Sequence, residues 1–138
     1  MSARTWADLD AATRRVATTL KRDLVPEEPG VYAWYREGKR IYVGEGGSLR
    51  DRIWSNHLGQ NKTLNGSAFR RNVAQHLEYG SAAAINSGDV VLTTEQLAAV
   101  RAWIMSCHVA WLTCATKAAA RALEKTLKTE FQPPLTKT

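Results

Sequence analysis

The chain has 138 residues, of which 44% are hydrophobic and 23% are charged. This length suits a single domain, residues 1–138, with room for one modest core, and the composition is that of a globular protein rather than a disordered or fibrous one. No apolar run approaches the roughly 18 residues of a membrane span, and the start lacks the apolar stretch of a signal peptide. We therefore expect a cytoplasmic protein without a membrane partner.

The charge balance favours a polyanionic partner. Nineteen Lys and Arg residues against 13 Asp and Glu residues give a net charge of +6. Such cations release counterions when they bind nucleic-acid phosphates, although many basic proteins never contact nucleic acid. The sharpest basic stripe follows helical steps of three and four near the C-terminus and consists of Lys117, Arg121, Lys125 and Lys128.

The N-terminal segment predicts a helix that precedes the rest of the domain. Between residues 6 and 23, apolar side chains recur at helical steps, at Trp6, Leu9, Val16 and Leu20. Pro26 and Pro29 then end the helix. We expect this extension, residues 1–29, to pack onto the core, because no motif in it suggests chemistry.

Two segments rich in β-branched and aromatic residues predict a β-hairpin with strands over 31–36 and 40–44. A three-residue loop between them would place Tyr32, opposite Gly44, and Tyr42 on one face of the sheet. A two-residue loop would put the two tyrosines on opposite faces, because a slip of one residue inverts the side chains of a strand. We expect the three-residue loop.

The remaining elements follow from capping residues and apolar runs. In chain order they are a helix over 48–58, a helix over 68–78, a loop over 80–92 with a short strand at 90–92, a helix over 94–106, a strand over 108–114 and a helix that ends near 131. The caps are Ser48, Thr93 with Gln96, and Thr116. The strand over 108–114 is almost continuously apolar, so we expect it at the centre of the sheet and buried on both faces. The expected fold class is α/β (α+β), a small three-stranded, mostly antiparallel sheet flanked by helices, with an extra N-terminal helix.

Glu124 falls inside the apolar stripe of the C-terminal helix, which consists of Ala120, Leu123, Leu127 and Phe131. An ionised carboxylate removed from water costs several kcal/mol unless a cation or hydrogen bonds compensate it. From the residues alone two interpretations stay open. Glu124 either pairs with Arg52 or another arginine for structural reasons, or it binds a divalent metal.

Six positions spread over more than a hundred residues form one pattern. Gly30-Val31-Tyr32 is followed ten residues later by Tyr42-Val43-Gly44, and Arg52 comes ten residues after Tyr42. His57, Glu124 and the tail Pro133-Pro134-Leu135-Thr136 complete it, with Glu124 twelve residues before Thr136. In order and spacing this pattern, over residues 30–136, resembles the GIY-YIG nuclease family.

The resemblance implies a metal-dependent DNA endonuclease on a GIY-YIG fold. It assigns Glu124 as the ligand of one Mg²⁺ ion, for which Mn²⁺ would substitute. Arg52 would stabilise the charge that grows on the scissile phosphate. Tyr32 would position and deprotonate the attacking water, which requires a nearby cation or base. Tyr42 would hold the water and the phosphate, His57 completes the catalytic set, and cleavage would leave 5′-phosphate and 3′-hydroxyl ends.

Three positions depart from the family pattern. The residue four after Arg52 is Asn56, and His57 comes one step later, so either His57 reaches the site from a shifted helix or Asn56 takes the position. Glu45 stands where many members carry lysine. Thr136 replaces the asparagine that usually ends the motif, although its hydroxyl can still hydrogen-bond a tyrosine or the backbone.

Candidate DNA contacts are named from charge and neighbourhood, and they are Gly44, Arg50, Lys62, Arg70, Arg71, Lys117, Arg121 and Lys125. Gly44 would let the backbone approach the substrate closely. RNA stays open as a substrate, and a homodimer or a partner protein would supply specificity. The alternative function is a binding module on the same fold that holds nucleic acid or a protein and is catalytically weak or inactive.

Overall fold

The structure is a computed structural model that describes residues 4–58, 64 and 67–136. Its α-helices are α1 (Trp6–Ala11), α2 (Ala68–His76), α3 (Ala82–Ser87), α4 (Thr94–Met105) and α5 (Lys117–Glu130). Two 3₁₀ turns, η1 (Ala17–Thr19) and η2 (Arg22–Leu24), and a π-helix, η3 (Asp51–His57), complete the helical elements. The strands are β1 (Arg15–Val16), β2 (Gly30–Arg36), β3 (Lys39–Gly46) and β4 (His108–Thr113).

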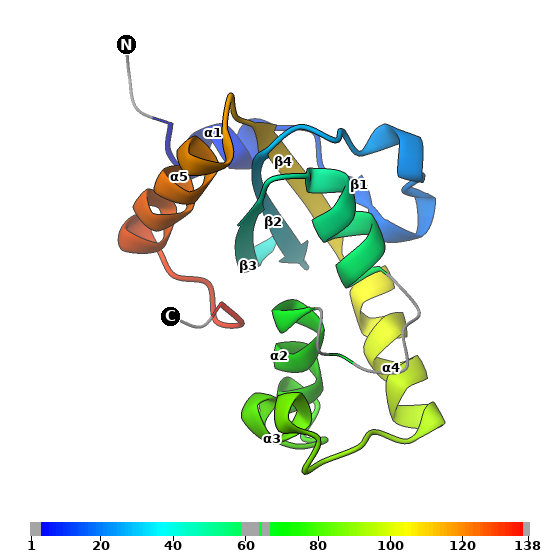
Figure 1. Cartoon of the computed structure of the whole chain (residues 1–138). Coiled ribbons are helices and arrows are strands. Elements are labelled where there is room, and N and C mark those ends of the chain that lie inside the picture. The colour runs from blue at the N-terminus through cyan, green and yellow to red at the C-terminus, as the bar shows by residue number, and fades with distance from the viewer. Residues whose placement is uncertain (1–3, 59–63, 65–66, 137–138) are drawn as a thin grey trace.

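The strands form one antiparallel sheet in the order β1-β4-β2-β3. In Figure 1, α1 and α5 lie on one side of this sheet, and the green helix after β3, which is η3, lies on the other side with α2 and α4 beyond it. The α+β class is therefore as predicted, but the sheet has four strands rather than three.

The expected three-residue loop of the hairpin is wrong. The turn has two residues, Glu37 and Gly38, because Arg36 pairs with Lys39. Both turn residues have positive φ angles, 54° and 77°. This conformation matches the right-handed twist of two strands joined by a tight turn.

A β-bulge nevertheless restores the expected side-chain pattern. Tyr35 pairs with Arg40 whereas Trp34 pairs with Tyr42, so Ile41 is an extra residue in β3. One extra residue cancels the one-residue slip of the shorter turn. The two motif tyrosines therefore share one face of the sheet, as the sequence predicts.

The helix expected over residues 6–23 is wrong beyond its first turns. α1 ends at Ala11, since Ala12 already has an extended backbone with ψ 155°. The chain then forms β1, in which Arg15 pairs with Val109 of β4, followed by η1 and η2. The open edge of β4 offers ladder hydrogen bonds that a surface helix cannot use, and Val16 is β-branched and so favours a strand.

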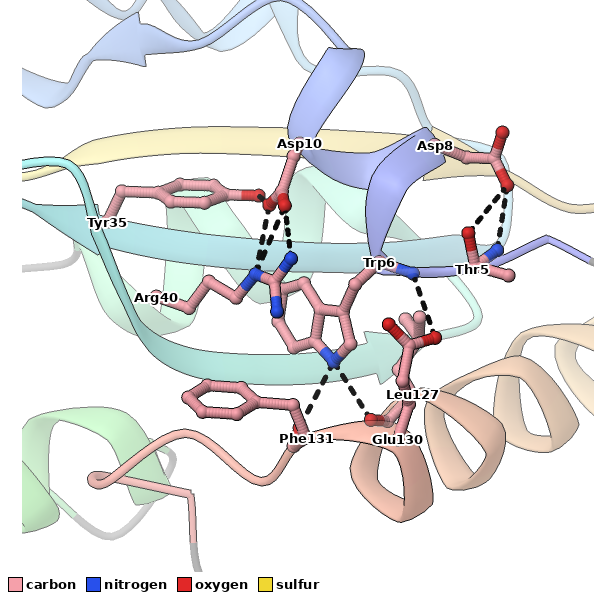
Figure 2. A network of polar contacts seen from close by, with 9 residues as sticks. All are labelled: Thr5, Trp6, Asp8, Asp10, Tyr35, Arg40, Leu127, Glu130 and Phe131. Atoms are coloured by element: carbon pink, nitrogen blue, oxygen red, sulfur yellow. Dashed lines mark hydrogen bonds and ion pairs between the residues drawn. The ribbon is translucent and has the colours of Figure 1, made fainter.

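α1 is fixed to the end of α5 and to β3 (Figure 2). The fully buried Trp6 donates its indole N–H to the carbonyl oxygens of Leu127, at 2.8 Å, and Phe131, at 3.0 Å. The Leu127 oxygen also accepts the Phe131 N–H at 2.9 Å, so the indole bonds to carbonyl groups at the C-terminal end of α5. Asp10 accepts hydrogen bonds from Arg40 of β3 at 3.1 and 3.2 Å. The N-terminal segment therefore holds α5 against the sheet.

The segment between α2 and α4 contains α3 rather than a loop, and the strand expected at 90–92 is absent from this described part of the chain. Ser81 caps α3, and Gly88 ends it with a φ of 87°. The predicted capping box of α4 at Thr93 and the predicted cap of α5 at Thr116 are both formed.

Two hydrophobic clusters fill the two sides of the sheet. The cluster beneath α5 includes Trp6, Val31, Val43 and Leu127. The larger cluster on the other side includes Tyr32, Trp34, Tyr42, Ile53, Phe69 and Ile104. β4 is central, as predicted, although only Val109 and Ala110 of this strand are fully buried. Among the described helices, none is long and apolar enough to cross a membrane.

Candidate active site

The π-helix η3 carries Arg52 and His57 to the same side of the sheet. Its hydrogen bonds span five residues, as in the bond from the Leu58 N–H to the Ile53 oxygen at 3.1 Å. In an α-helix the residue four after Arg52 would lie beside it, whereas the wider turn brings the residue five on into that position. The structure thus forms the shifted-helix alternative, in which His57 reaches the site.

His57 joins the two motif tyrosines in a buried aromatic group. The Tyr32 hydroxyl lies 2.5 Å from His57 Nε2, and the two residues are 2% and 3% exposed. The ring of Tyr42 stacks on that of Tyr32 at 6.3 Å and meets His57 edge-on at 5.9 Å. Phe69 of α2 packs on Tyr42 with ring centroids 4.8 Å apart. Elements far apart in the chain therefore hold the phenols and the imidazole together.

Two glycines in β3 make room for site side chains. A Cβ on Gly44 would lie 2.4 Å from the Tyr32 hydroxyl oxygen, and a Cβ on Gly46 would lie 2.5 Å from Arg52 Cγ. Both distances are far below the roughly 3.5–4.0 Å of a normal non-bonded contact. Gly44 therefore admits the Tyr32 ring, a role that the sequence does not suggest. Gly46 has no counterpart among the expected residues, although glycines at alternate strand positions are a visible sign of close approach.

Burial sets the protonation states of the group. It raises the pKa of Tyr32 well above its ordinary value and that of Tyr42 to about 12, so both phenols keep their protons at neutral pH. Burial, aided by the charges of Arg52 and Arg70, lowers the pKa of His57 to about 3. His57 is therefore neutral at pH 7, so one of its ring nitrogens carries hydrogen and the other accepts a hydrogen bond.

Ser67 is a member of this group that the sequence does not indicate. Its Oγ lies 2.5 Å from His57 Nδ1, and the residue is 1% exposed. The same oxygen accepts the backbone N–H of Arg70 at 3.1 Å as the N-cap of α2. Tyr32, His57 and Ser67 thus form one buried hydrogen-bonded chain. The only sequence signal for Ser67 is that of a helix cap, which many serines share.

Glu124 approaches the tyrosines from α5. Its side chain is 19% exposed, and its charge raises the pKa of both Tyr32 and Tyr42. The carboxylate pairs with Lys128 at 3.0 Å, and among the residues that the structure describes it forms no ion pair with an arginine. Within residues 4–58, 64 and 67–136, the Arg52 guanidinium forms no ion pair, and its charge acts on His57 and on both tyrosines.

α5 presents a basic groove beside Glu124. A cavity of about 690 Å³ runs along the helix, and its charged lining consists of Glu124, Arg121, Lys125 and Lys128. Lys117 lies at the start of the same helix against Gly47, where a Cβ would be 3.4 Å from Lys117 Cδ. The structure therefore brings three residues of the predicted basic stripe, Arg121, Lys125 and Lys128, into one groove with Glu124.

The other candidate DNA contacts separate into different environments. Arg50 donates to a backbone carbonyl at 2.9 Å and pairs with Glu27 at 2.7 Å, which ties it into the fold. Arg70 is buried and its charge acts on His57, whereas the charge of Arg71 acts on Tyr42. Lys62 lies outside the described residues.

The three positions that depart from the family pattern also differ in their environments. Thr136 is buried at the open edge of β3, where its hydroxyl accepts the Val43 N–H at 2.8 Å. Glu45 is half-buried, and its Oε2 has no hydrogen-bond partner in the described part of the chain. The charge of Glu45 also raises the pKa of Tyr32. The side chain of Asn56 is outside what the structure describes.

The donor chemistry at Glu124 fits a hard divalent cation. Carboxylate oxygen is a preferred ligand of Mg²⁺, and the buried Oε2 of Glu45, which has no hydrogen-bond partner among the described residues, adds negative charge that acts on Tyr32. No cluster of three or more His, Cys, Asp or Glu side chains suited to a metal occurs among the described residues. The protein would thus provide few ligands, which Mg²⁺ accepts because it keeps several waters and binds substrate phosphates.

Known proteins share the fold of this chain. Two solved structures of the GIY-YIG N-terminal endonuclease domain of UvrC from Thermotoga maritima, both point mutants bound to the catalytic divalent cation, share the fold with TM-scores of 0.50. They are 19% and 18% identical to this chain, and each match covers 90% of this chain and 99% of the other. No curated protein matches the sequence. The profile of the GIY-YIG catalytic domain matches residues 17–138, and the chain therefore belongs to that family.

Proposed function

We propose that the protein is a magnesium-dependent endonuclease that hydrolyses phosphodiester bonds in DNA. The main support is that Tyr32, hydrogen-bonded to the neutral His57, lies within reach of the charges of Arg52 and Glu124. Phosphoryl transfer depends on positioning and on neutralisation of charge more than on covalent help. These residues supply both, and the family fold supplies the precedent.

The water is activated through Tyr32 and His57. Because Tyr32 is protonated at neutral pH, it accepts the proton of the attacking water only as its own proton passes to His57 Nε2. This requires the tautomer with hydrogen on Nδ1, which donates to Ser67 Oγ. The water oxygen bonds to phosphorus, the bond to the 3′-oxygen breaks, and solvent protonates the leaving oxygen. The ends are then 5′-phosphate and 3′-hydroxyl.

Arg52 binds the scissile phosphate and stabilises its developing charge. A planar guanidinium can bridge two phosphate oxygens, and Arg52 has no competing ion pair in the described structure. A phosphate bound there offsets the positive charge that lowers the pKa of His57, so substrate makes His57 a better proton acceptor. Glu124 would hold a Mg²⁺ ion, which would supply Lewis-acid stabilisation of the charge on the phosphate.

Cleavage assays test this function. Supercoiled plasmid and single-stranded DNA are incubated with Mg²⁺ or Mn²⁺ and the wild type, Glu124→Ala or Arg52→Ala. We expect metal-dependent nicking or cutting that falls by about a hundredfold or more in each variant. A matched control is Arg14→Ala, which removes an exposed arginine far from the site in sequence. Equal activity in all four proteins would show that the assignment of the site is wrong.

One observation favours the alternative of a binding module. Lys128 pairs with Glu124 at 3.0 Å and so occupies the carboxylate that a metal needs. In a catalytic protein, a divalent ion must displace this ammonium. If folded wild type binds DNA at low salt but cuts nothing, and Lys128→Met does not restore cutting, the protein is a nucleic-acid-binding member of the family.

A further inference from the structure

A second cavity lies behind the π-helix, apart from the groove on α5. Its volume is about 490 Å³, within the roughly 300–1,000 Å³ of pockets that bind small molecules. Trp54, Ser55 and Leu58 line it, whereas Arg52 and His57 of the same turns do not. The helix segment that carries the proposed catalytic residues thus forms, with its other side, the wall of a separate hollow.

The chemistry of this cavity is cationic at one part and apolar at another. Arg101 of α4 and Arg22 of η2 line it, together with the hydroxyl-bearing residues Thr18 and Ser55. The remaining lining is apolar or aromatic and consists of Ala17, Leu20, Trp54, Leu58 and Met105. Guanidinium groups bind phosphate, and an indole can stack on the face of a nucleobase.

Part of the Arg101 guanidinium group is buried without a hydrogen-bond partner among the described residues. Its Nε is buried and has no hydrogen-bond partner among the described residues, which is a costly state for part of a charged group. Burial lowers the pKa of Arg70, and the charge of Arg101 lowers it further, so the two cations repel each other. Arg22 is mostly exposed, and its ion pair with Asp23 is long, at 4.0 Å. An anion in the cavity would offset the positive charge of Arg101 and Arg22, which line it.

We propose that this cavity binds a nucleotide, with its phosphate on Arg101 and Arg22 and its base among Trp54 and the apolar residues. The inference deepens the proposed nuclease function, because the nucleotide is either free in solution or an unpaired nucleotide of the DNA strand held by the active site. Both sources present the same phosphate and base to the cavity.

Calorimetric titration of the Glu124→Ala chain tests the inference without cleavage. The probes are deoxyadenosine 5′-monophosphate, deoxyadenosine, inorganic phosphate, and DNA duplexes with or without one unpaired adenosine nucleotide. We expect the nucleotide to bind about tenfold or more tightly than deoxyadenosine, which lacks the charged hydrogen bonds of the phosphate. We expect a similar advantage over inorganic phosphate, which lacks the base that stacks on Trp54. If only the strand supplies the nucleotide, the free compound fails to bind and the duplex with the unpaired nucleotide binds more tightly than the paired duplex.

Variants assign the binding to the cavity. Arg101→Gln and Trp54→Leu should each weaken nucleotide binding about tenfold or more, whereas Arg14→Gln, which removes an exposed arginine, should change it less than about twofold. Circular dichroism establishes that each variant is folded. Equal loss in Arg14→Gln, binding of phosphate as tight as that of the nucleotide, or no binding of any nucleotide probe overturns the proposal. If the protein binds the nucleotide in this way but never cuts DNA, only the proposed nuclease function is contradicted.

Discussion

A neutral imidazole can either donate or accept a proton at Nε2, so the partner of its other nitrogen decides what His57 can do. That partner is Ser67, whose Oγ already accepts one backbone N–H from α2. With two lone pairs, the same oxygen can also accept the Nδ1–H of His57. We infer that Ser67 is a positioning residue that keeps Nε2 free to receive the Tyr32 proton.

Replacement of Ser67 tests this positioning role. Ser67→Ala leaves Nδ1 without a buried partner, so we expect kcat to fall about 10- to 100-fold with KM nearly unchanged, the effect typical of lost orienting partners. Ser67→Thr keeps the hydroxyl and should restore most of kcat. Nitrogen-15 NMR of His57 should show hydrogen mainly on Nδ1 in the wild type and a mixture of tautomers in Ser67→Ala.

The control for Ser67 is another helix cap. Ser81→Ala removes the N-cap of α3, where the hydroxyl accepts the Ala84 N–H at 3.1 Å, without touching His57. Each variant should lose about 1 kcal/mol of stability through its cap. If both lowered kcat equally, the effect of Ser67 would come from stability alone.

The burial of His57 makes the folding free energy depend on pH. Its pKa is about 3 in the folded chain and about 6.5 when unfolded, so between these values the unfolded chain binds more protons. The depressed pKa means that stability is full above pH 6.5 and is lost as pH falls toward 3. Between pH 7.5 and pH 5.0 this group should cost about 2 kcal/mol of unfolding free energy.

Urea unfolding of the wild type and of His57→Gln at the two pH values measures this cost. The variant loses the titrating group, so its stability should fall by about 2 kcal/mol less than that of the wild type over the same pH step. The other histidines and the carboxylates are common to both proteins and cancel in the comparison. Parallel loss in both proteins would mean that His57 is charged or exposed in solution.

At the scale of elements, the sequence correctly predicts features that depend on local interactions, such as helix caps. The caps at Ser48, Thr93 and Thr116 begin their helices as expected, with the Ser48 hydroxyl accepting the Asp51 N–H at 3.3 Å. The N-terminal failure has a non-local cause. Residues 15–16 pair with the edge of β4, about ninety residues later in the chain. No local sequence pattern indicates this pairing.

The incorrect predictions at the site also have non-local causes. The sequence predicts a three-residue hairpin turn, whereas the turn has two residues. The bulge at Ile41 restores the register because core burial of both tyrosines selects it. The sequence shows that His57 comes five residues after Arg52. Whether the helix widens to bring the two side chains together, or His57 points away from Tyr32, depends on packing. Ser67 is identifiable only from the contact that this widened turn creates.

Exchange of two neighbours tests whether the π-helix is intrinsic to the backbone. The double variant Asn56→His with His57→Asn moves the imidazole to the four-residue spacing of an α-helix. If packing keeps the wider turn, the histidine points away from Tyr32, and activity should match that of His57→Asn alone. In an α-helix, the residue five positions after Arg52 lies about 140° around the helix axis from Arg52. An α-helix and a π-helix therefore cannot both direct residue 57 toward Tyr32.

The outcome of the exchange is measured as kcat, with folding checked by thermal melting. Activity near that of the wild type would show that the segment relaxes to an α-helix when the histidine moves. The prediction rests on the observed five-residue hydrogen bond between Ile53 and Leu58, which the exchange leaves in place.

At the scale of the molecule, the two sides of the sheet have separate tasks that meet at one edge. The β2–β3 hairpin and η3 hold the tyrosines, Arg52 and His57, while α5, anchored by Trp6, carries Glu124 and the basic groove. β3 is the edge strand, so charge from α5 can act on tyrosines that lie on the opposite face. The candidate site is therefore a product of the whole arrangement, and no single motif contains it.

The groove on α5 should carry the salt dependence of DNA binding. Each phosphate contact contributes a slope of about 0.9 when the logarithm of affinity for duplex DNA is plotted against the logarithm of salt concentration. In the Glu124→Ala background, Arg121→Gln with Lys125→Gln removes two candidate contacts and should reduce this slope by about 2. The matched control, Arg14→Gln with Lys39→Gln, removes the same charge from exposed residues outside the groove and should change the slope by much less. Fluorescence anisotropy between 50 and 200 mM salt, on the order of the usual working range, gives the slopes. Equal slopes for the two double variants would mean that net charge, rather than the groove, attracts the DNA.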